Sequence, residues 1–287
     1  MKLLGLRRKD AGKDTDAAAR CARIKSKDES DMSWQVCFLR GLLRGVVITG
    51  ISLGLLVGLG WLSSLLPRPQ DAQRRMSSAS NMKQMGVIFK MYAMEHDEMF
   101  PPLTRYDNTW YVDLQAIHPE YDSDPYILLI PGADDELMPS DEYRALFKQE
   151  TPDWERITRI AARHYVYPGW AVTDEAQAKA LAALREDLAP EDYGKDLETE
   201  NGIIYRLREG VEKHVMPEAE TSAASGDPRA KIPVMFENIY MVPKARRREK
   251  TRINVLYLDG HVEHHLLSDN IFPATETMAE LFCARPE

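Results

Sequence analysis

Residues 74–103 read RRMSSASNMKQMGVIFKMYAMEHDEMFPPL, and the rest of the fold can be inferred from this segment. Apolar residues recur in it at steps of three and four, which is the spacing of one face of an α-helix. These positions are Met76, Ala79, Met82, Gly86, Phe89 and Ala93, flanked by Met85, Ile88 and Tyr92. The pattern predicts a helix over residues 71–96 that lies on an apolar surface. Phe100-Pro101-Pro102 then leads the chain away from the helix.

Upstream of this helix the chain carries no charge from Gly45 to Leu66. About 20 apolar residues span the hydrocarbon core of a bilayer as a helix, so we expect residues 45–66 to form a single transmembrane helix. Residues 1–44 contain eleven Lys/Arg and six Asp/Glu, and this positive excess places them in the cytoplasm. Residues 67–287 are then expected to form an extracytoplasmic domain. In a Gram-negative cell the protein would be anchored in the inner membrane and this domain would lie in the periplasm.

The segment before the predicted membrane helix and the part of the chain that follows it carry net charges of opposite sign. The whole chain carries −8 and residues 1–44 carry +5, so the remainder carries −13. An acidic outer part lacks the Lys/Arg excess that neutralises phosphates, and we expect no nucleic-acid partner. The three cysteines, Cys21, Cys37 and Cys283, do not suffice for a disulfide framework. Cys283 is expected to be a buried, unpaired thiol near a helix end, with pairing between chains as the alternative.

The outer part is expected to combine short helices with short strands, an α+β fold. The expected strands are 126–130, 165–167, 170–172, 202–206 and 232–237, and the expected helices are 140–149, 152–163, 173–187 and 274–283. Ile253–Leu258 and His261–Leu267 predict a β-hairpin with the two-residue turn Asp259-Gly260. Residues 217–231 are polar and small, which is typical of a flexible loop. The predicted architecture is an amphipathic half-helix on a small antiparallel sheet with inserted helices.

These features together resemble the bacterial type IV pilin-like proteins and type II secretion pseudopilins, especially the prepilin-like proteins that end in a His-x9-Asp-Gly signature. The matching positions are Pro67, Asn81, Lys83, Gln84, Gly86, Asn254, Asp259, Gly260 and His261. The resemblance is closest over 67–102 and 232–267. It is absent from 1–40 and from 173–231, which would be an insertion.

The resemblance also implies a cleavage site. Family members are cut after a Gly, and the mature helix carries Glu at its fifth position. Counting back from Pro67 puts the cut between Gly45 and Val46, which would make the preceding residues a long leader instead of a cytoplasmic tail. The fifth position is then Gly50, so the family resemblance implies a minor or terminal subunit, or a relative outside the filament.

Three further positions depart from the family pattern. The signature histidine is replaced by Glu249. Two positions that carry cysteines in many relatives are Ser78 and Ile130 here, so neither is left as an unpaired thiol.

Gly50, Gly54 and Gly58 form GxxxGxxxG on one face of the predicted membrane helix. Such a face lets two helices approach closely, so we expect lateral packing against a second copy or another membrane protein.

His261, His264 and His265 of the predicted hairpin are the candidate metal ligands of the sequence. Alternation places His261 and His265 on one strand face and His264 on the other. Histidines four residues apart on a strand are roughly 13 Å apart along the chain, and zinc usually needs three or four protein ligands. We therefore expect solvent-facing histidines, no metal and no cofactor.

Other motifs point to contacts instead of chemistry. No nucleophile elbow, phosphate loop or HExxH occurs, so no catalytic residue is expected. Residues 244–252 hold six Lys/Arg. This run is expected to meet anionic lipid or an acidic partner, or to be a solvated loop.

The sequence thus favours a non-enzymatic, membrane-anchored structural or assembly protein of a secretion or pilus-type system. It would form homo- or hetero-oligomers with pilin-like or secretion-system proteins. One alternative is an uncleaved signal-anchor protein that uses the outer domain as a binding module. The other is an envelope enzyme or metal-binding protein.

Overall fold

The computed structural model describes residues 38–39, 42–58, 69–122, 124–132, 140–200, 202–217, 226–241 and 251–285. The chain divides into two units, Met1–Pro67 and Arg68–Glu287. In the first unit, residues 42–58 form a helix whose large apolar side chains are exposed. Within the described ranges, no helix combines the length and the apolar character that a membrane span needs. Residues 59–66 of the predicted span lie outside those ranges.

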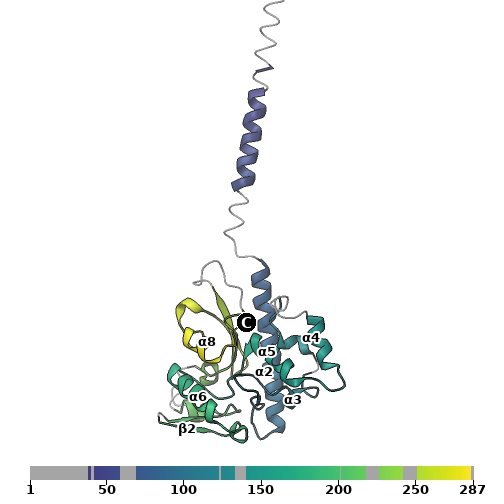
Figure 1. The fold of residues 1–287 in the computed structure, drawn as a ribbon. Helices are drawn as coiled ribbons and strands as arrows, with labels where there is room; N and C mark the ends of the chain where they lie inside the picture. The colour runs from purple at the N-terminus through teal and green to yellow at the C-terminus, as the bar shows by residue number, and fades with distance from the viewer. Residues whose placement is uncertain are drawn as a thin grey trace, which may run out of the picture. The chain divides into compact units, whose positions relative to one another are not determined.

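The second unit is an α+β domain, as the sequence predicts (Figure 1). Its helices are α2 (Pro69–Glu95), α3 (Leu114–Ile117), α4 (Ser140–Phe147), α5 (Trp154–His164), α6 (Glu175–Asp187), α7 (Glu212–Val215) and α8 (Glu276–Phe282). Its 3₁₀ helices are η1 (Pro125–Leu128), η3 (Pro190–Asp192), η5 (Pro228–Lys231) and η7 (Leu267–Asp269). Its strands are β1 (Tyr165–Val166), β2 (Leu197–Thr199), β3 (Gly202–Ile204), β4 (Pro233–Glu237), β5 (Arg252–Tyr257) and β6 (Val262–Leu266).

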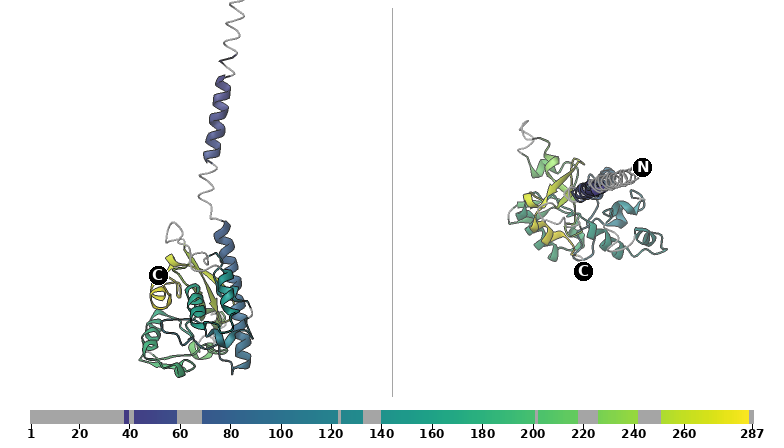
Figure 2. Two further views of the ribbon diagram at one scale, coloured as in Figure 1. Left: turned by 45° about the vertical axis from the view of Figure 1, so that its right-hand side comes forward. Right: turned by 90° about the horizontal axis from the view of Figure 1, so that it is seen from above.

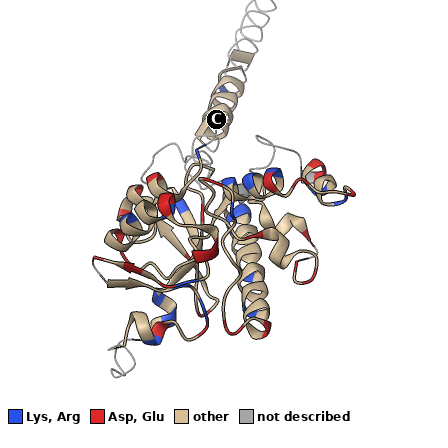
Figure 3. Cartoon of the chain, turned by 60° about the horizontal axis from the view of Figure 1, so that its bottom comes forward, with Lys and Arg blue, Asp and Glu red and all other residues tan. Residues whose placement is uncertain are grey.

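Four strands form one antiparallel sheet in the order β1-β4-β5-β6, and β2 pairs with β3 separately. Side chains alternate between the two faces of the sheet. Asn254 and Leu256 of β5 therefore face α2, whereas Ile253 and Val255 face the opposite side. The two side views show α2 along one face of the sheet and α8 beyond the other (Figure 2). Acidic and basic residues are interspersed over the domain (Figure 3).

The helix predicted at 71–96 is confirmed as α2. It starts at Pro69, whose missing N–H costs nothing in the first turn. Met82, Met85 and Phe89 are fully buried, but Met76, which the predicted stripe includes, is 70% exposed. Ser78 occupies the inward position instead and is fully buried. Near the start of α2 the buried face is therefore shifted from the predicted one by one residue, from Ala79 to Ser78. The surface under this part of the helix is polar.

The β-hairpin is confirmed, but its turn differs from the prediction. Gly260 donates its N–H to the Tyr257 carbonyl at 2.9 Å, and Tyr257 donates to the His261 carbonyl at 3.0 Å. The loop therefore has three residues, a type I turn followed by a left-handed residue. Gly260 has φ +96°, whereas Asp259 is not in the left-handed region. Asp259 holds the turn with its carboxylate, which accepts the His261 N–H at 3.0 Å.

The prediction of a strand at 126–130 is wrong, because residues 126–128 belong to the 3₁₀ helix η1. Pro125 is its first residue, and the Asp124 carboxylate accepts the Tyr126 N–H at 3.2 Å, which caps the turn. A short apolar run reads as a strand by composition, but the Asp-Pro pair before it starts a helical turn.

The remaining predicted elements are mostly in place. The helices at 140–149, 152–163 and 274–283 are confirmed as α4, α5 and α8. The helix predicted at 173–187 is α6, which begins at Glu175 and is capped by the Asp174 side chain. The predicted strand at 170–172 is a single bridge between Trp170 and Arg206. Within the predicted loop 217–231, residues 228–231 form η5, and residues 218–225 lie outside the described part.

Cys283 follows α8 as a buried free thiol, as expected. Burial raises the pKa of this thiol to about 12, so it stays protonated and unreactive at neutral pH. The other two cysteines lie outside the described residues.

Candidate functional site at the contact of α2 with the β5–β6 hairpin

α2 approaches the hairpin most closely at Gly86. A Cβ atom at this position would lie 3.1 Å from Leu256 Cδ1, a tighter contact than most side chains tolerate. Four residues on, Lys90 Nζ donates to the Asp259 carbonyl oxygen at 3.1 Å and so ties α2 to the hairpin turn. The resemblance singles out Gly86 and Asp259, and the structure brings both to this contact.

Asn254 ties the other end of the hairpin to α2. Its Nδ2 donates to the Arg75 carbonyl oxygen at 3.0 Å. The order of contacts is the same along both elements, since Arg75 meets Asn254 and Lys90 meets Asp259. β5 therefore runs along α2 in the same direction, and the contact extends over some fifteen residues of the helix.

Asn254 also binds a buried carboxylate, that of Glu237 at the end of β4. Its backbone N–H donates to Oε2 at 2.8 Å and its Nδ2 donates to Oε1 at 2.9 Å. The Asn254 Oδ1 atom accepts from His264 Nδ1. Burial lowers the pKa of His264, and the charges of Arg75 and Arg252 lower it further, so this imidazole is neutral at pH 7.

Glu237 is only 2% exposed, and Ser78 of α2 donates its hydroxyl proton to the same carboxylate. Burial raises the pKa of Glu237, while the bonds from Ser78 and Asn254 and the charge of Arg74 oppose the rise. The Glu237 carboxyl thus joins three elements, α2, β4 and β5. We call Ser78, Tyr165, Glu237 and Asn254 the buried polar network; His264, which is exposed, bonds Asn254 at its edge.

The buried polar network continues into the middle of the chain. Ser78 Oγ lies 3.1 Å from Tyr165 Oη, and Tyr165 donates to the Leu129 carbonyl oxygen at 3.3 Å. Asn81 Nδ2 donates to the same carbonyl at 3.0 Å. The two positions at which many pilin-like relatives carry cysteines are Ser78 and Ile130. Hydrogen bonds here join α2 to the residue directly before Ile130.

Of the hairpin histidines expected to face solvent, His264 is exposed and His261 is partly exposed, but His265 is buried. His265 is 8% exposed, and its Nε2 lies 2.7 Å from Tyr257 Oη. His261 stacks on the Tyr257 ring with centroids 4.6 Å apart, and its Nδ1 lies 2.6 Å from Asp259 Oδ1. His261 and His265 do share one face, as alternation predicts, with Glu263 Oε2 3.9 Å and 3.6 Å from their Nε2 atoms. Across the described ranges, no three His, Cys, Asp or Glu side chains are placed to hold a metal ion.

Several predicted positions do not join the α2–hairpin contact. Lys83 and Gln84 are exposed on α2, and Pro67 lies outside the described residues.

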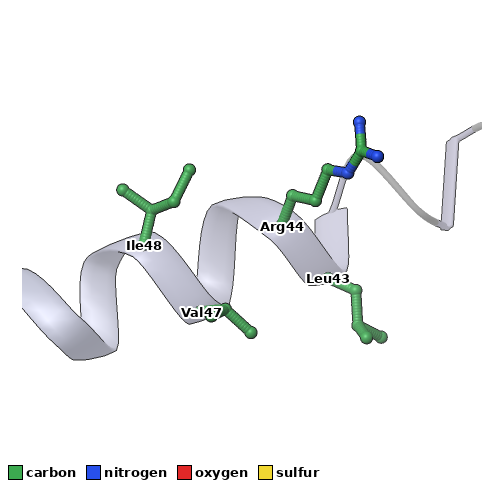
Figure 4. Close-up of a pocket in the computed structure, with 4 residues that line it drawn as sticks. All are labelled: Leu43, Arg44, Val47 and Ile48. Atoms are coloured by element: carbon green, nitrogen blue, oxygen red, sulfur yellow. The ribbon is translucent and has the colours of Figure 1, made fainter.

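The predicted cleavage residues, Gly45 and Val46, lie on the helix at 42–58. Cβ atoms added at Gly50, Gly54 or Gly58 would meet no atom within 4 Å, so this face is open in the described structure. A shallow hollow beside the predicted cut is lined by Leu43, Arg44, Val47 and Ile48 (Figure 4). Arg44 and Ile48 point to one side of the helix, and Leu43 and Val47 point to the other.

Sequence reasoning missed the centre of the site. Glu237, Tyr165 and Lys90 belong to no motif, and Ser78 stands out in the sequence only as the residue at a family cysteine position. One signal was available, because an acid ends the otherwise apolar strand β4. A buried carboxylate such as that of Glu237 needs hydrogen-bond donors around it. The spacing of residues in the sequence does not show that Ser78 and Asn254 are these donors.

Arg206 forms a second buried polar centre near the C-terminal end of α2. It is 1% exposed, and its guanidinium donates to Tyr167 Oη at 3.3 Å and to the Pro101 carbonyl oxygen. The same group lies over the Trp170 ring, 5.4 Å from its centroid. Arg206 therefore fixes the chain that leaves α2 against the segment around Trp170.

Comparisons of the chain with protein-family models, with curated proteins and with solved structures each found no match.

Proposed function

We propose that this chain is a membrane-anchored, pseudopilin-like assembly protein of a secretion or pilus-type system. It acts through contacts with further copies or with pilin-like partners instead of through catalysis. The observation that supports this proposal is the way α2 lies along an antiparallel sheet. Gly86, Asn254 and Asp259, at which the sequence resembles the pilin-like family, are the positions that make the contact.

The outer face of α2 supports assembly through contacts. Met76, Val87, Met91 and Met94 are exposed there, at intervals that keep them near one side of the helix. Methionine is flexible and polarisable, so it adapts to different partner surfaces. An exposed apolar stripe on a long helix is a surface that a neighbouring subunit would cover.

The mature N terminus tests the proposal. The chain would be extracted from membranes of its own host and its first residue determined by mass spectrometry. A start at Val46 supports a processed pseudopilin-like subunit. A Gly45→Leu variant should then stay uncut, whereas Gly41→Leu, four residues upstream, should be cut normally.

An uncleaved signal anchor is the second candidate, and Gly50 favours it. The pilin-like family carries Glu at this position, and the resemblance assigns that carboxylate to contacts within a filament. A start at Met1 or Lys2, with monomers in detergent, would support an anchored binding module and overturn the assembly role.

A further inference from the structure

The strand β6 forms one edge of the four-stranded sheet. Its backbone bonds to β5 at His261 and Leu267 show that every second residue, counted from these two, directs its N–H and C=O groups inward. The N–H and C=O groups of Val262 and His264, and the N–H of Leu266, therefore point away from the sheet. Within the described ranges no residue bonds these outward groups. We call this row of groups the β6 edge.

The opposite edge of the sheet is covered. β1 has only two residues, and the next residue, Tyr167, donates its N–H to the Trp110 carbonyl oxygen at 3.0 Å. Pro168 follows and has no N–H to offer to a further strand. β6 contains no proline and pairs with β5 without a shift in register. Natural proteins usually protect such a regular edge, so an open β6 edge indicates a partner strand.

The β6 edge is complementary to itself. An antiparallel second copy, related by a two-fold axis at His264, places the two His264 residues opposite each other. Val262 then lies opposite Leu266 of the second copy, and both are half-buried apolar residues. Glu263 lies opposite His265 of the second copy, on the other face of the sheet. In its own chain the Glu263 carboxylate is already 3.6 Å from His265 Nε2. The register thus sets apolar beside apolar and carboxylate beside imidazole.

The same pairing brings the two α2 helices together on one face of the joined sheet. α2 contacts β5 and β6, and the Arg75 carbonyl is bound by the β5 residue directly opposite His264. Neighbouring strands lie about 4.8 Å apart, so the two helix axes would run antiparallel at about 10 to 14 Å. Ala72 and Ala79 lie one turn before and one turn after Arg75 on this flank, and Met76 beside them is 70% exposed. The long, flexible Met76 side chain suits the space between the helices.

We propose that the β6 edge binds the β6 edge of a second copy, so that two chains join their sheets into one continuous antiparallel sheet. About four main-chain hydrogen bonds form across the joint, because Val262, His264 and Leu266 supply the outward groups. This inference deepens the proposed assembly role and rests on it, since it names the surface at which a further copy is bound.

Positive charge on the α2 face opposes the pairing. Arg75 and the exposed Arg252 lie near the two-fold axis in both copies, and the exposed Asp269 offsets only part of their charge. Burial lowers the pKa of His264, and both arginines lower it further, so the imidazoles that meet at the axis are neutral at pH 7. Salt screens the arginines, so the two copies should associate more tightly at about 0.5 M than at about 0.05 M NaCl.

Cysteine cross-linking tests the inference on the full chain in membranes of its own host, with Cys21 and Cys37 replaced by serine. His264→Cys places a thiol at the two-fold axis, where the paired Cα atoms are about 5.5 Å apart, a distance that a disulfide spans. Glu263→Cys is the matched control, because this neighbouring position is also exposed but its two Cα atoms would be about 7 to 8 Å apart. We expect about tenfold more disulfide dimer from His264→Cys under mild oxidation.

Amide hydrogen exchange of the unmodified chain gives a second reading that does not depend on a cysteine variant. The outward amide of His264 should exchange about tenfold faster when the chain in detergent is diluted to monomers. The amide of His265 bonds β5 and should keep its rate. Val262→Lys should speed the exchange at His264 without dilution, because it puts a charge against Leu266 of the second copy. Gln84→Lys, at an exposed position of α2, should not.

The outcomes separate this inference from the proposed assembly role. Equal cross-linking of the two cysteine variants, or less His264→Cys dimer at high salt, overturns the β6 pairing. An unchanged exchange rate of the His264 amide on dilution does the same. Protection of this amide in membranes without any His264→Cys dimer indicates a strand from another protein and also overturns the pairing. If Met91→Cys on the outer face of α2 still cross-links two copies, the assembly role stands. If no copies associate and the chain starts at Met1, both are overturned.

Discussion

Ser78 of α2 donates a hydrogen bond to the buried carboxylate of Glu237, a residue 159 positions further along the chain. This bond connects the first half of the long helix to the strand next to β5, and Asn254 completes the environment of the same carboxylate from β5. Removing any one partner leaves the others buried with an unmet hydrogen-bonding group, which is costly.

Ser78→Ala should therefore destabilise the domain. We expect a loss of about 1 to 3 kcal/mol, because the Glu237 carboxylate and the Tyr165 hydroxyl both lose a buried partner. Urea unfolding followed by tryptophan fluorescence measures the change. Ser80→Ala, at an exposed position of the same helix, should change stability by less than about 0.5 kcal/mol. Equal effects of the two substitutions would show that the buried polar network contributes nothing.

Asp122 gives a pH dependence of defined sign. Burial raises the pKa of this carboxyl to about 6, and one of its oxygens has no hydrogen-bond partner in the described structure. The pKa of Asp122 is higher in the folded than in the unfolded protein, so the protonated carboxyl favours folding. This contribution of Asp122 to the free energy of unfolding is fully present below about pH 4. It is lost as the pH rises through about 6.

Asp122→Asn should remove that dependence. The amide oxygen can still accept the Asp124 N–H, which bonds Asp122 Oδ1 at 3.0 Å. We expect a gain of up to about 3 kcal/mol at pH 8 and little change at pH 4. Unfolding midpoints measured across this range would show it. The exposed Asp187→Asn serves as control, and a gain that is equal at both pH values would contradict the assignment.

Gly86→Leu should weaken the contact between α2 and the hairpin. Its side chain would occupy the space of Leu256, and overpacking of a buried contact typically costs about 1 to 3 kcal/mol. Leu256→Ala in the Gly86→Leu background should recover part of the loss, although Leu256→Ala alone is destabilising. A double-mutant cycle by urea unfolding measures this coupling. Purely additive effects would mean that the two side chains do not compete for space.

Arg206→Ala should cost more than the removal of an exposed arginine. It removes the guanidinium that donates to the Tyr167 hydroxyl and one of the two donors to the Pro101 carbonyl, the other being Tyr167 itself. It also opens a cavity beside Trp170, so we expect a loss of about 3 kcal/mol. Arg208→Ala, which breaks an ion pair with Asp196 near the surface, should cost less than about 1 kcal/mol. Thermal unfolding compares the two, and a similar cost would contradict the role of Arg206.

The sequence predicts those parts of the fold that carry a periodic or local signal. α2 follows from its apolar spacing, and the hairpin follows from alternation around Asp259-Gly260. The run Tyr126–Ile130 is too short for periodicity to separate a strand from a helical turn, so the cap at Asp124 decided the outcome.

The candidate site was predicted only where a resemblance supplied positions. Gly86, Asn254 and Asp259 were singled out in this way, but nothing in their spacing shows which atoms they contact. Ser78 and Glu237 become partners only when the sheet is assembled and α2 lies on it. The burial of His265 has the same origin, because its partner Tyr257 lies across the hairpin.

The parallel course of β5 and α2 also has a mechanical consequence. A pulling force applied to the chain before Pro69 acts along the axis of α2. The bonds at Arg75, Ser78 and Lys90 cross from the helix to the sheet, so they are loaded side by side in shear instead of one after another. Force would have to break them together before the helix could slide. The domain is thus built to transmit tension from its first helix to the hairpin without a change of register.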